Sequence, residues 1–262
     1  MTASLVVERS QATATVWLDR PQVHNALDED LIAALDAAFA SLSEDASVRV
    51  VVLAGRGRSF CSGADLAWMR RAAALDEEGN RADAMRLALM LRRLASLPCP
   101  TIARVQGAAR GGGVGLAAAC DLCVCADDAS FALTEVRLGL IPAVIGPHVV
   151  RAIGARQAMR YFLTAGPIDA ARAREIGLAH EVVPAAGLDD CVAALCAQLL
   201  AGGPQAQAQA KRLVNDLAGR EASGMVDADT ASRIARIRAT PEAREGIEAF
   251  FGKRPPSWIA RP

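Results

Sequence analysis

Residues 101–142 constrain the fold of this chain more than any other segment. They contain an apolar run at residues 101–105, three consecutive glycines at 111–113, an alanine-rich stretch and a second apolar run at 122–126. Short apolar runs near glycines are typical of strands, and their alternation with helices is typical of an α/β fold. We therefore expect an α/β protein in which the glycines mark the passage from a loop into a helix.

The glycine triplet also predicts a binding site for a negative oxygen. The first turn of a helix has N–H groups without partners, glycine has no Cβ to shield them, and such donors stabilise an anion. One carboxylate among apolar neighbours, Glu135, follows about twenty residues later, beside Phe131, Leu133 and Val136. Apolar surroundings raise the pKa of a carboxyl group toward the range of an acid–base catalyst. This combination favours enolate chemistry, and the alternative for Glu135 is a surface carboxylate or an ion pair with Arg137.

The first hundred residues continue the pattern of strands and helices. Alternating apolar residues predict a hairpin from residues 5–8 and 13–18, and a helical period predicts a helix over 28–43. The continuous apolar run at 48–54 predicts a buried strand, and a second helix is expected over 81–96.

Beyond Leu188 the pattern is purely helical, with breaks expected near 202–204, 219–224 and 240–241, where glycine and proline occur. We place a boundary at Gly202, which gives a core at residues 1–202 and a helical C-terminal region at 203–262. The apolar residues of that region must be buried against the core or against another subunit.

Composition excludes several classes of partner. The 29 basic and 29 acidic side chains cancel, which gives no electrostatic reason for binding nucleic acid or a membrane surface. No apolar run approaches the roughly 18 residues of a membrane span, and the N-terminal residues lack the apolar core of a signal peptide. The seven cysteines then indicate buried or free thiols, and we expect a cytoplasmic protein.

A second loop of small residues lies at 60–66, with the sequence F-C-S-G-A-D-L, after the predicted strand at 48–54. Gly63 permits a tight turn, the small Ala64 leaves its amide approachable, and Asp65 can begin a helix. Two such loops, each following a strand of one sheet, can direct one amide apiece at a single oxygen. The pair is an oxyanion hole in outline.

The two loops together resemble those of the enoyl-CoA hydratase/isomerase (crotonase) family. The likeness rests on S-G-A-D-L at 62–66 and G-A-A-R-G-G-G at 107–113, with R-P at 20–21 and N-A-L at 25–27. It continues through 120–122, 135–142 and 177–178. It implies a crotonase-type spiral of ββα units followed by a C-terminal helical trimerisation region, in a homotrimer or hexamer.

The resemblance also implies roles for individual residues. The carbonyl oxygen of an acyl-CoA thioester would be held by the amides of Ala64 and Gly112, and Glu135 would transfer protons. No metal is implied, and no cofactor other than the coenzyme A of the substrate. The residues expected to contact the coenzyme A are His24, Ala26, Ser62, Asp65 and Leu66, with Lys253 reaching the nucleotide in a neighbouring subunit.

One position departs from the family pattern. Typical hydratases of the family carry a second glutamate three residues after the middle glycine of the triplet, and here that residue is Gly115. Family members with one glutamate include Δ3,Δ2-enoyl-CoA isomerases, so an isomerase is the alternative. Residues 135–145 resemble the methylglutaconyl-CoA and carboxygeranoyl-CoA hydratases of leucine and acyclic-terpene breakdown, some of which also have this glycine. We therefore predict a hydratase acting on a branched or carboxylated 2-enoyl-CoA.

Two further features of the sequence, a cluster of cysteines and a dinucleotide-binding pattern, would indicate other classes of protein. Cys120, Cys123 and Cys125 are too close together for a tetrahedral zinc site without other ligands, so we expect core thiols. Residues 113–118 match the dinucleotide pattern G-x-G-x-x-A, but residues 107–112 separate them from the preceding strand. The pattern is therefore weak, and an NAD-binding oxidoreductase is kept only as an alternative from another class. A catalytically inactive CoA-binding protein is the third class.

Overall fold

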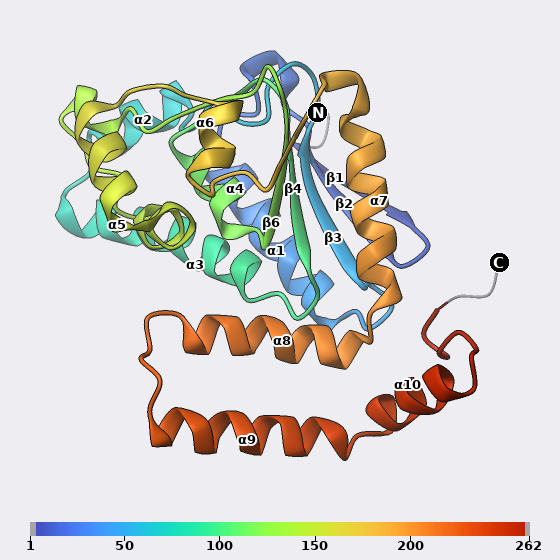
Figure 1. Cartoon of the computed structure of the whole chain (residues 1–262). Coiled ribbons are helices and arrows are strands. Elements are labelled where there is room, and N and C mark those ends of the chain that lie inside the picture. The colour runs from blue at the N-terminus through green and yellow to red at the C-terminus, as the bar shows by residue number, and fades with distance from the viewer. Residues whose placement is uncertain (1–3, 260–262) are drawn as a thin grey trace.

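A computed structural model describes residues 4–259 and shows a largely parallel sheet at the centre of the molecule (Figure 1). The strand order is β1-β2-β3-β4-β6-β9, in which only β1 and β2 are antiparallel. The strands are β1 (Leu5–Ser10), β2 (Thr13–Leu18), β3 (Val50–Gly55), β4 (Thr101–Val105), β6 (Leu122–Ala126) and β9 (Glu181–Val183). The predicted hairpin, the predicted buried strand β3 and the two other predicted strands, β4 and β6, are confirmed.

A second, smaller sheet contains β5 (Ala108–Arg110), β7 (Ser130–Ala132) and β8 (Ile168–Asp169). Strand β5 follows directly after β4, and β7 follows directly after β6. A helical segment comes after each of these strand pairs, as α1 does after the pair β1 and β2. This repeated order agrees with the spiral of ββα units that the resemblance implied.

Helices cover both faces of the central sheet. On one face lie α1 (Glu29–Glu44), α3 (Glu77–Ala95), α4 (Gly112–Ala119) and α5 (Gly146–Thr164), and on the other lies α7 (Leu188–Ala201) (Figure 1). Side chains of β3 alternate between the two cores, because Val51 and Leu53 belong to the first and Val50 and Val52 to the second. Covering on both faces explains why the strand is continuously apolar.

The remaining helices differ in part from the sequence prediction. Helix α3 begins at Glu77, four residues before the predicted start, because the Asp76 side chain accepts a hydrogen bond from the Gly79 amide and caps it. A short helix α2 (Leu66–Ala72) precedes it and is capped by Asp65, as predicted. Helix α6 (Ala170–Glu175) and helix α5, which kinks at Gly154, had no counterpart in the prediction.

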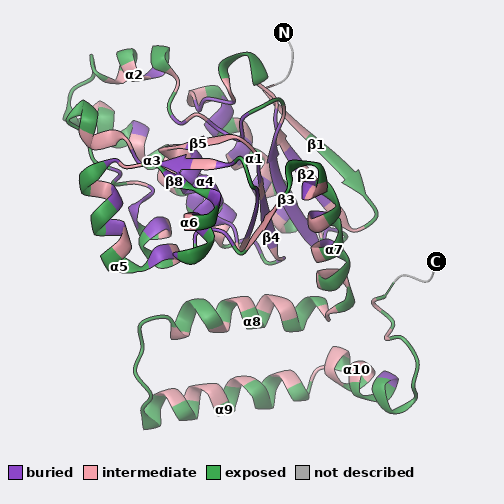
Figure 2. Cartoon of the chain, turned by 45° about the horizontal axis from the view of Figure 1, so that its top comes forward, coloured by how far each residue is buried: buried purple, intermediate pink, exposed green. Residues whose placement is uncertain are grey.

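The C-terminal region consists of α8 (Pro204–Leu217), α9 (Gly224–Arg238) and α10 (Pro241–Phe251), separated at the three predicted breaks. Figure 2 shows that these helices lie beside the main body with few buried residues, whereas strands β3 and β4 and helix α4 are mostly buried. The Lys211 ammonium ties α8 to the main body through an ion pair of 2.7 Å with Asp121. The division at Gly202 into two functional regions stays a prediction.

Across residues 4–259 no single helix is long and apolar enough to span a membrane, and only residues 185–201 and 204–217, bent by 105°, pass that test together. The seven cysteines are free, and Cys120, Cys123 and Cys125 are buried, which confirms them as core thiols. Burial raises the pKa of the Cys120 and Cys125 thiols to about 12. In the described part of the chain, no group of His, Cys, Asp and Glu side chains could hold a metal ion.

Candidate active site

The loop between β3 and α2 presents the Ala64 amide to solvent. It runs beside Leu27 as a parallel bridge, in which the Leu27 amide donates to the Gly63 carbonyl at 2.7 Å and the Asp65 amide donates to the Leu27 carbonyl at 2.8 Å. In such a bridge the N–H of the central residue points away from its neighbour, and the Ala64 N–H has no acceptor within residues 4–259. Gly63 has φ +91°, a conformation that favours glycine.

The second loop ends at the N-terminus of α4. Gly111 has φ +45° and supplies no side-chain cap, so the helix begins at Gly112 with its first amides unpaired among the described residues. The first backbone bond of the helix runs from the Gly115 amide to the Gly111 carbonyl at 3.1 Å. The Gly112 N–H is thus available to an external oxygen.

The two loops lie in direct contact. The Arg110 amide donates to the Cys61 carbonyl at 2.9 Å, and a Cβ on Gly63 would lie 2.9 Å from the Arg110 carbonyl oxygen. A Cβ on Gly113 would lie well under 3.0 Å from the Cys61 carbonyl oxygen. Such an approach is possible only for glycine at both positions. The structure therefore brings together the segments that carry the Ala64 and Gly112 amides.

Glu135 reaches the same place from a third segment. It begins the 3₁₀ helix η2 (Glu135–Leu138) after β7, and a Cβ on Gly111 would lie 3.0 Å from Glu135 Oε1. The carboxylate therefore adjoins the N-terminus of α4. Its Oε2 atom is buried and has no hydrogen-bond partner, and no ion pair joins Glu135 to Arg137 within residues 4–259. The surface or salt-bridged alternative is thus not what the structure shows.

Burial sets the protonation behaviour of Glu135. Desolvation raises its pKa above the ordinary value of 4.5, and a hydrogen bond from its own backbone amide opposes that shift only in part. A carboxyl group with a raised pKa accepts and returns protons more readily near neutral pH than an exposed one. Two free amides and one such carboxyl group can support a reaction that passes through an enolate.

We expect Glu135→Gln to raise the thermal unfolding midpoint by a few degrees at about pH 7.5. Burial raises the pKa of Glu135 in the folded state, so folding favours its protonated form. That stabilisation is present below the unfolded-state pKa and is lost as the pH rises through the folded-state pKa. Above that pH the parent protein must bury an ionised carboxylate, whereas the glutamine of the variant stays neutral. The difference between variant and parent should therefore shrink toward about pH 4. Differential scanning calorimetry at several pH values measures the difference in unfolding midpoint between variant and parent, with exposed Glu221→Gln as the control. A variant less stable than the parent at every pH would contradict this account.

Five of the six residues expected to contact coenzyme A surround the Ala64 loop. The residues at 23–27 run beside it, and the Ser62 amide donates to the His24 carbonyl at 2.9 Å. His24 Nδ1 lies 3.0 Å from Ser59 Oγ, Ala26 is buried, and Leu66 is 73% exposed at the start of α2. Both carboxylate oxygens of Asp65 are bonded within the protein, Oδ1 as the cap of α2 and Oδ2 to Arg20. The contacts of these residues with coenzyme A stay a prediction.

Lys253 is not brought to this site within one chain. It follows α10, which lies in the C-terminal region away from α2 in both whole-chain views. Its proposed contact with the nucleotide of a neighbouring subunit stays a prediction.

The sequence prediction gave no role to Asn25. Its side chain is fully buried, and Nδ2 donates to the carbonyls of Arg56, Ser59 and Phe60 at 2.9, 2.9 and 3.1 Å. Its Oδ1 accepts from the Arg20 amide at 2.9 Å. Asn25 therefore fixes the start of the Ala64 loop against the segment before α1. The only signal in the sequence is an asparagine shortly after Pro21. In the structure Asn25 has φ +56°, a conformation that asparagine tolerates better than most residues.

Ile145 fills the space beside Gly115. A Cβ on Gly115 would lie well under 3.0 Å from Ile145 Cγ2 and 2.8 Å from Ile145 Cβ. Ile145 is 3% exposed and directly precedes α5. The position at which typical hydratases of the family carry a second glutamate is therefore closed by an apolar side chain.

Gly115→Ala should lower the unfolding midpoint although alanine favours a helix. Overpacking a core costs about 1–3 kcal/mol, more than the roughly 0.5–1 kcal/mol that alanine gains over glycine. In an Ile145→Ala background the penalty should shrink, because the Cγ2 contact is gone. Gly224→Ala, in α9 with no atom within 4 Å of the new Cβ, is the matched control. Equal effects of Gly115→Ala in both backgrounds would contradict the proposed contact.

The dinucleotide pattern at 113–118 is the interior of α4. All of residues 113–119 are buried, and Gly113 packs against Cys61. A glycine loop that binds a pyrophosphate needs exposed amides, so these residues do not form one.

A cavity of about 590 Å³ lies elsewhere, between α8 and the main body. Its lining includes Ala117, Ala118, Asp121 and Lys211 but none of Ala64, Gly112 and Glu135. It meets the C-terminal end of α4, whereas the free amides lie at the N-terminal end. The cavity is therefore separate from the candidate active site.

Comparison with known proteins gives consistent matches across the whole chain. The profile of the family described as Enoyl-CoA hydratase/isomerase matches residues 8–261. The crystal structure of an enoyl-CoA hydratase from Shewanella pealeana has a TM-score of 0.95 and 40% identity, covering 98% of this chain and 96% of the other. That of an enoyl-CoA hydratase from Mycobacterium smegmatis has a TM-score of 0.92 and 36% identity, covering 98% and 100%. A crotonyl-CoA hydratase of Syntrophomonas wolfei is 30% identical over 98% of both chains.

Proposed function

This chain belongs to the enoyl-CoA hydratase/isomerase family and is an enzyme of that family, and we propose that it adds water to a 2-enoyl-CoA thioester. The observation that supports the proposal most is the meeting of three segments at one place. Two loops whose amides at Ala64 and Gly112 have no partner among residues 4–259 lie in contact, and the Glu135 carboxylate lies beside the second loop. Its Oε2 atom is buried and has no hydrogen-bond partner in the same part of the chain.

The proposed mechanism uses these groups in turn. Water attacks the β-carbon while Glu135 accepts one of its protons, and the electron pair of the double bond moves to the thioester as an enolate. The Ala64 and Gly112 amides stabilise the negative carbonyl oxygen, and one such donor contributes about 2.7–4 kcal/mol to the transition state. Protonated Glu135 then returns the proton to the α-carbon. The β-carbon has then gained a hydroxyl group and the α-carbon a hydrogen, and Glu135 has returned to its starting protonation state.

We further propose a substrate with a branched or carboxylated acyl chain, such as a methylglutaconyl-type CoA ester. Its support is the similarity of residues 135–145 to hydratases of that kind. The relatives described above support enoyl-CoA chemistry but do not narrow the acyl chain. No cofactor besides the coenzyme A of the substrate enters the mechanism.

A Δ3,Δ2-enoyl-CoA isomerase is the second candidate, and one observation favours it. Ile145 closes the position of a second carboxylate at Gly115. Moving a double bond needs only one base that transfers a proton between two carbons, and Glu135 beside the two amides could do so. The two reactions share the enolate and differ in whether water is added.

A panel of acyl-CoA esters followed by mass spectrometry separates the candidates. We expect a 3-methylglutaconyl-type CoA to gain the mass of water, with little reaction of straight-chain crotonyl-CoA. Conversion of 3-enoyl to 2-enoyl esters, with no substrate gaining water, would replace the hydratase with the isomerase. Binding without turnover would favour an inactive CoA-binding protein, and an absorbance change at 340 nm with nicotinamide and an alcohol would favour an oxidoreductase.

We also propose that the chain assembles as a trimer or a dimer of trimers. Helix α10 exposes Ile247, Phe250 and Phe251, the last two at 79%, which is unfavourable for an isolated chain in water. Sedimentation at micromolar concentration should give a multiple of three chains, and Phe250→Ser with Phe251→Ser should weaken the assembly. A stable monomer of about 27 kDa would refute the prediction.

A further inference from the structure

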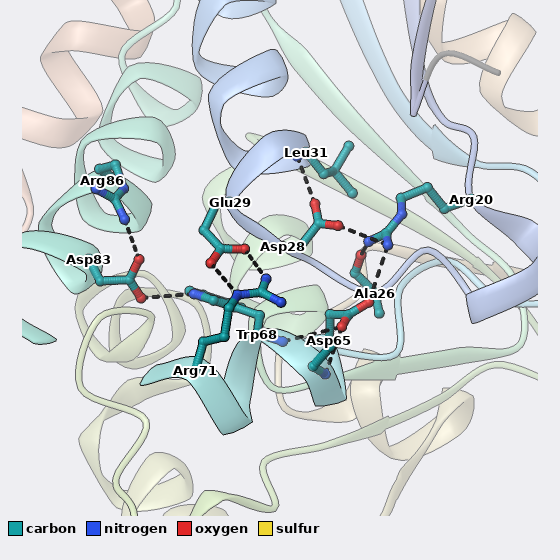
Figure 3. Close-up of polar contacts among 11 residues, drawn as sticks. Arg20, Ala26, Asp28, Glu29, Leu31, Asp65, Trp68, Arg71, Asp83 and Arg86 are labelled. Carbon is teal, nitrogen blue, oxygen red and sulfur yellow. Dashed lines mark hydrogen bonds and ion pairs between the residues drawn. The ribbon is translucent and has the colours of Figure 1, made fainter. Parts of the chain in front are cut away.

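One arginine joins three acceptors next to the Ala64 loop (Figure 3). Arg20 Nη1 donates to the Ala26 carbonyl at 2.5 Å, and Nη2 lies 2.8 Å from Asp28 Oδ2 and 3.2 Å from Asp65 Oδ2. The three charged side chains are only 15–18% exposed, so water screens the ion pairs less than it would on an open surface. Arg20 follows β2 and is 45 residues away from Asp65 in sequence.

Each of the two carboxylates also caps the N-terminus of a helix. Asp28 Oδ1 accepts from the Leu31 amide at 2.9 Å and caps α1. Asp65 Oδ1 accepts from the Ala67 amide at 2.9 Å and caps α2. The guanidinium group therefore holds the N-termini of two helices together. Because Asp65 is adjacent to Ala64, its position helps to set the direction of the Ala64 N–H.

The charges explain why a cation is needed at this point. Two carboxylates with no cation between them would repel each other and would oppose the negative oxygen that Ala64 is proposed to bind. Although burial alone would raise the pKa of Asp65, its hydrogen bonds with the Ala67 and Trp68 amides and with Arg20 lower it. Asp65 can then stay ionised and cap α2 while Arg20 lies between it and Asp28.

We propose that Arg20 is a positioning residue for the reaction, which sets the Ala64 amide through Asp65, Asp28 and the Ala26 carbonyl. The inference rests on the proposed function, in which that amide holds the thioester oxygen. Arg20 does not touch the substrate in this account. A misplacement of about 1 Å in such a donor can cost about a hundredfold in rate.

The structure offers a matched control for this proposal. Arg71 also links α1 to α2, through Nη2 of Arg71 and Oε2 of Glu29 at 2.6 Å, but it contacts neither Ala26 nor Asp65 in the described residues (Figure 3). Because that ion pair remains when Arg20 is changed, the two helices keep a link. Arg71→Gln therefore removes an ion pair between the same helices without touching the Ala64 loop.

The experiment compares Arg20→Lys and Arg20→Gln with Arg71→Gln. One readout is the infrared carbonyl band of bound butyryl-CoA labelled with ¹³C at the thioester, which moves to lower frequency when amides donate to its oxygen. The other is the division of the effect between kcat and KM on the substrate identified by the panel. We expect kcat to fall about tenfold for Lys and about a hundredfold for Gln, with KM little changed and the carbonyl shift reduced in the same order. Arg71→Gln should have the kcat and the carbonyl shift of the parent protein.

The outcomes separate the inference from the function on which it rests. If the parent protein itself fails to shift the carbonyl band, the proposed function fails. If the parent shifts the band and folded Arg20→Gln retains the full shift and kcat, Arg20 has no positioning role. Should the Arg20 variants fail to fold, Asp65→Asn provides the test, since it keeps the Oδ1 cap and weakens only the contact with Arg20. An unchanged carbonyl shift in that variant would overturn the proposal.

Discussion

Glu135→Gln should lower kcat by about a thousandfold and leave the binding of a saturated acyl-CoA nearly unchanged. Glutamine matches the shape of glutamate but cannot accept and return a proton, and a positioned acid–base group contributes roughly 10²–10⁴-fold. Binding should persist because the coenzyme A is expected to lie along the Ala64 loop rather than against Glu135. Stopped-flow or mass-spectrometric turnover gives kcat, and calorimetric titration with butyryl-CoA gives Kd.

Arg137→Gln is the control for that experiment. Arg137 lies in the same 3₁₀ helix, is exposed, and forms no ion pair with Glu135 in residues 4–259, so its loss should leave kcat unchanged. A kcat near the parent value in Glu135→Gln would remove Glu135 from the mechanism. A loss of both turnover and binding would indicate a structural role instead.

Elements with a strong local signal were predictable from the sequence. The hairpin, the buried strand β3 and helix α1 follow from apolar periodicity. The breaks between α8, α9 and α10 follow from glycine and proline. In each case the residues that decide the structure are neighbours in the chain.

Elements that depend on distant partners were not predictable. Strands β5 and β7 have three residues each, too few to show a period, and they exist because they pair with each other. Helix α3 starts early because Asp76 caps it within a charged stretch without apolar periodicity. Strand β9 is defined by its pairing with β6, more than fifty residues earlier.

The candidate site divides in the same way. The free amides after Gly63 and Gly111 and the apolar surroundings of Glu135 are consequences of local sequence, and the structure brings these segments together. The packing of Ile145 against Gly115 could not be predicted in the same way, because the two residues are thirty positions apart and meet only in the folded chain. Arg20 likewise gains its role from partners on two separate helices.

Gly112→Pro tests the oxyanion donor directly, and we expect it to lower kcat by about 10²–10³-fold. Gly112 is the first residue of α4, where proline is tolerated because the N–H has no partner inside the helix. The substitution thus removes one N–H donor at little cost to the helix. A new Cβ there would lie 2.7 Å from Leu27 Cδ1, the flexible end of a side chain, so some repacking is expected.

Gly112→Ala separates the lost donor from that repacking. Alanine brings the same Cβ to Leu27 but keeps the N–H, so it should retain most of the turnover and share any loss of stability with the proline variant. Circular dichroism and the unfolding midpoint check that α4 remains in both. Since an oxyanion donor acts more strongly on the transition state than on the bound ester, the difference between the two variants should appear in kcat more than in KM. Equal kcat values for proline and alanine would mean that the Gly112 amide does not hold the thioester oxygen, and the enolate would then require a different donor.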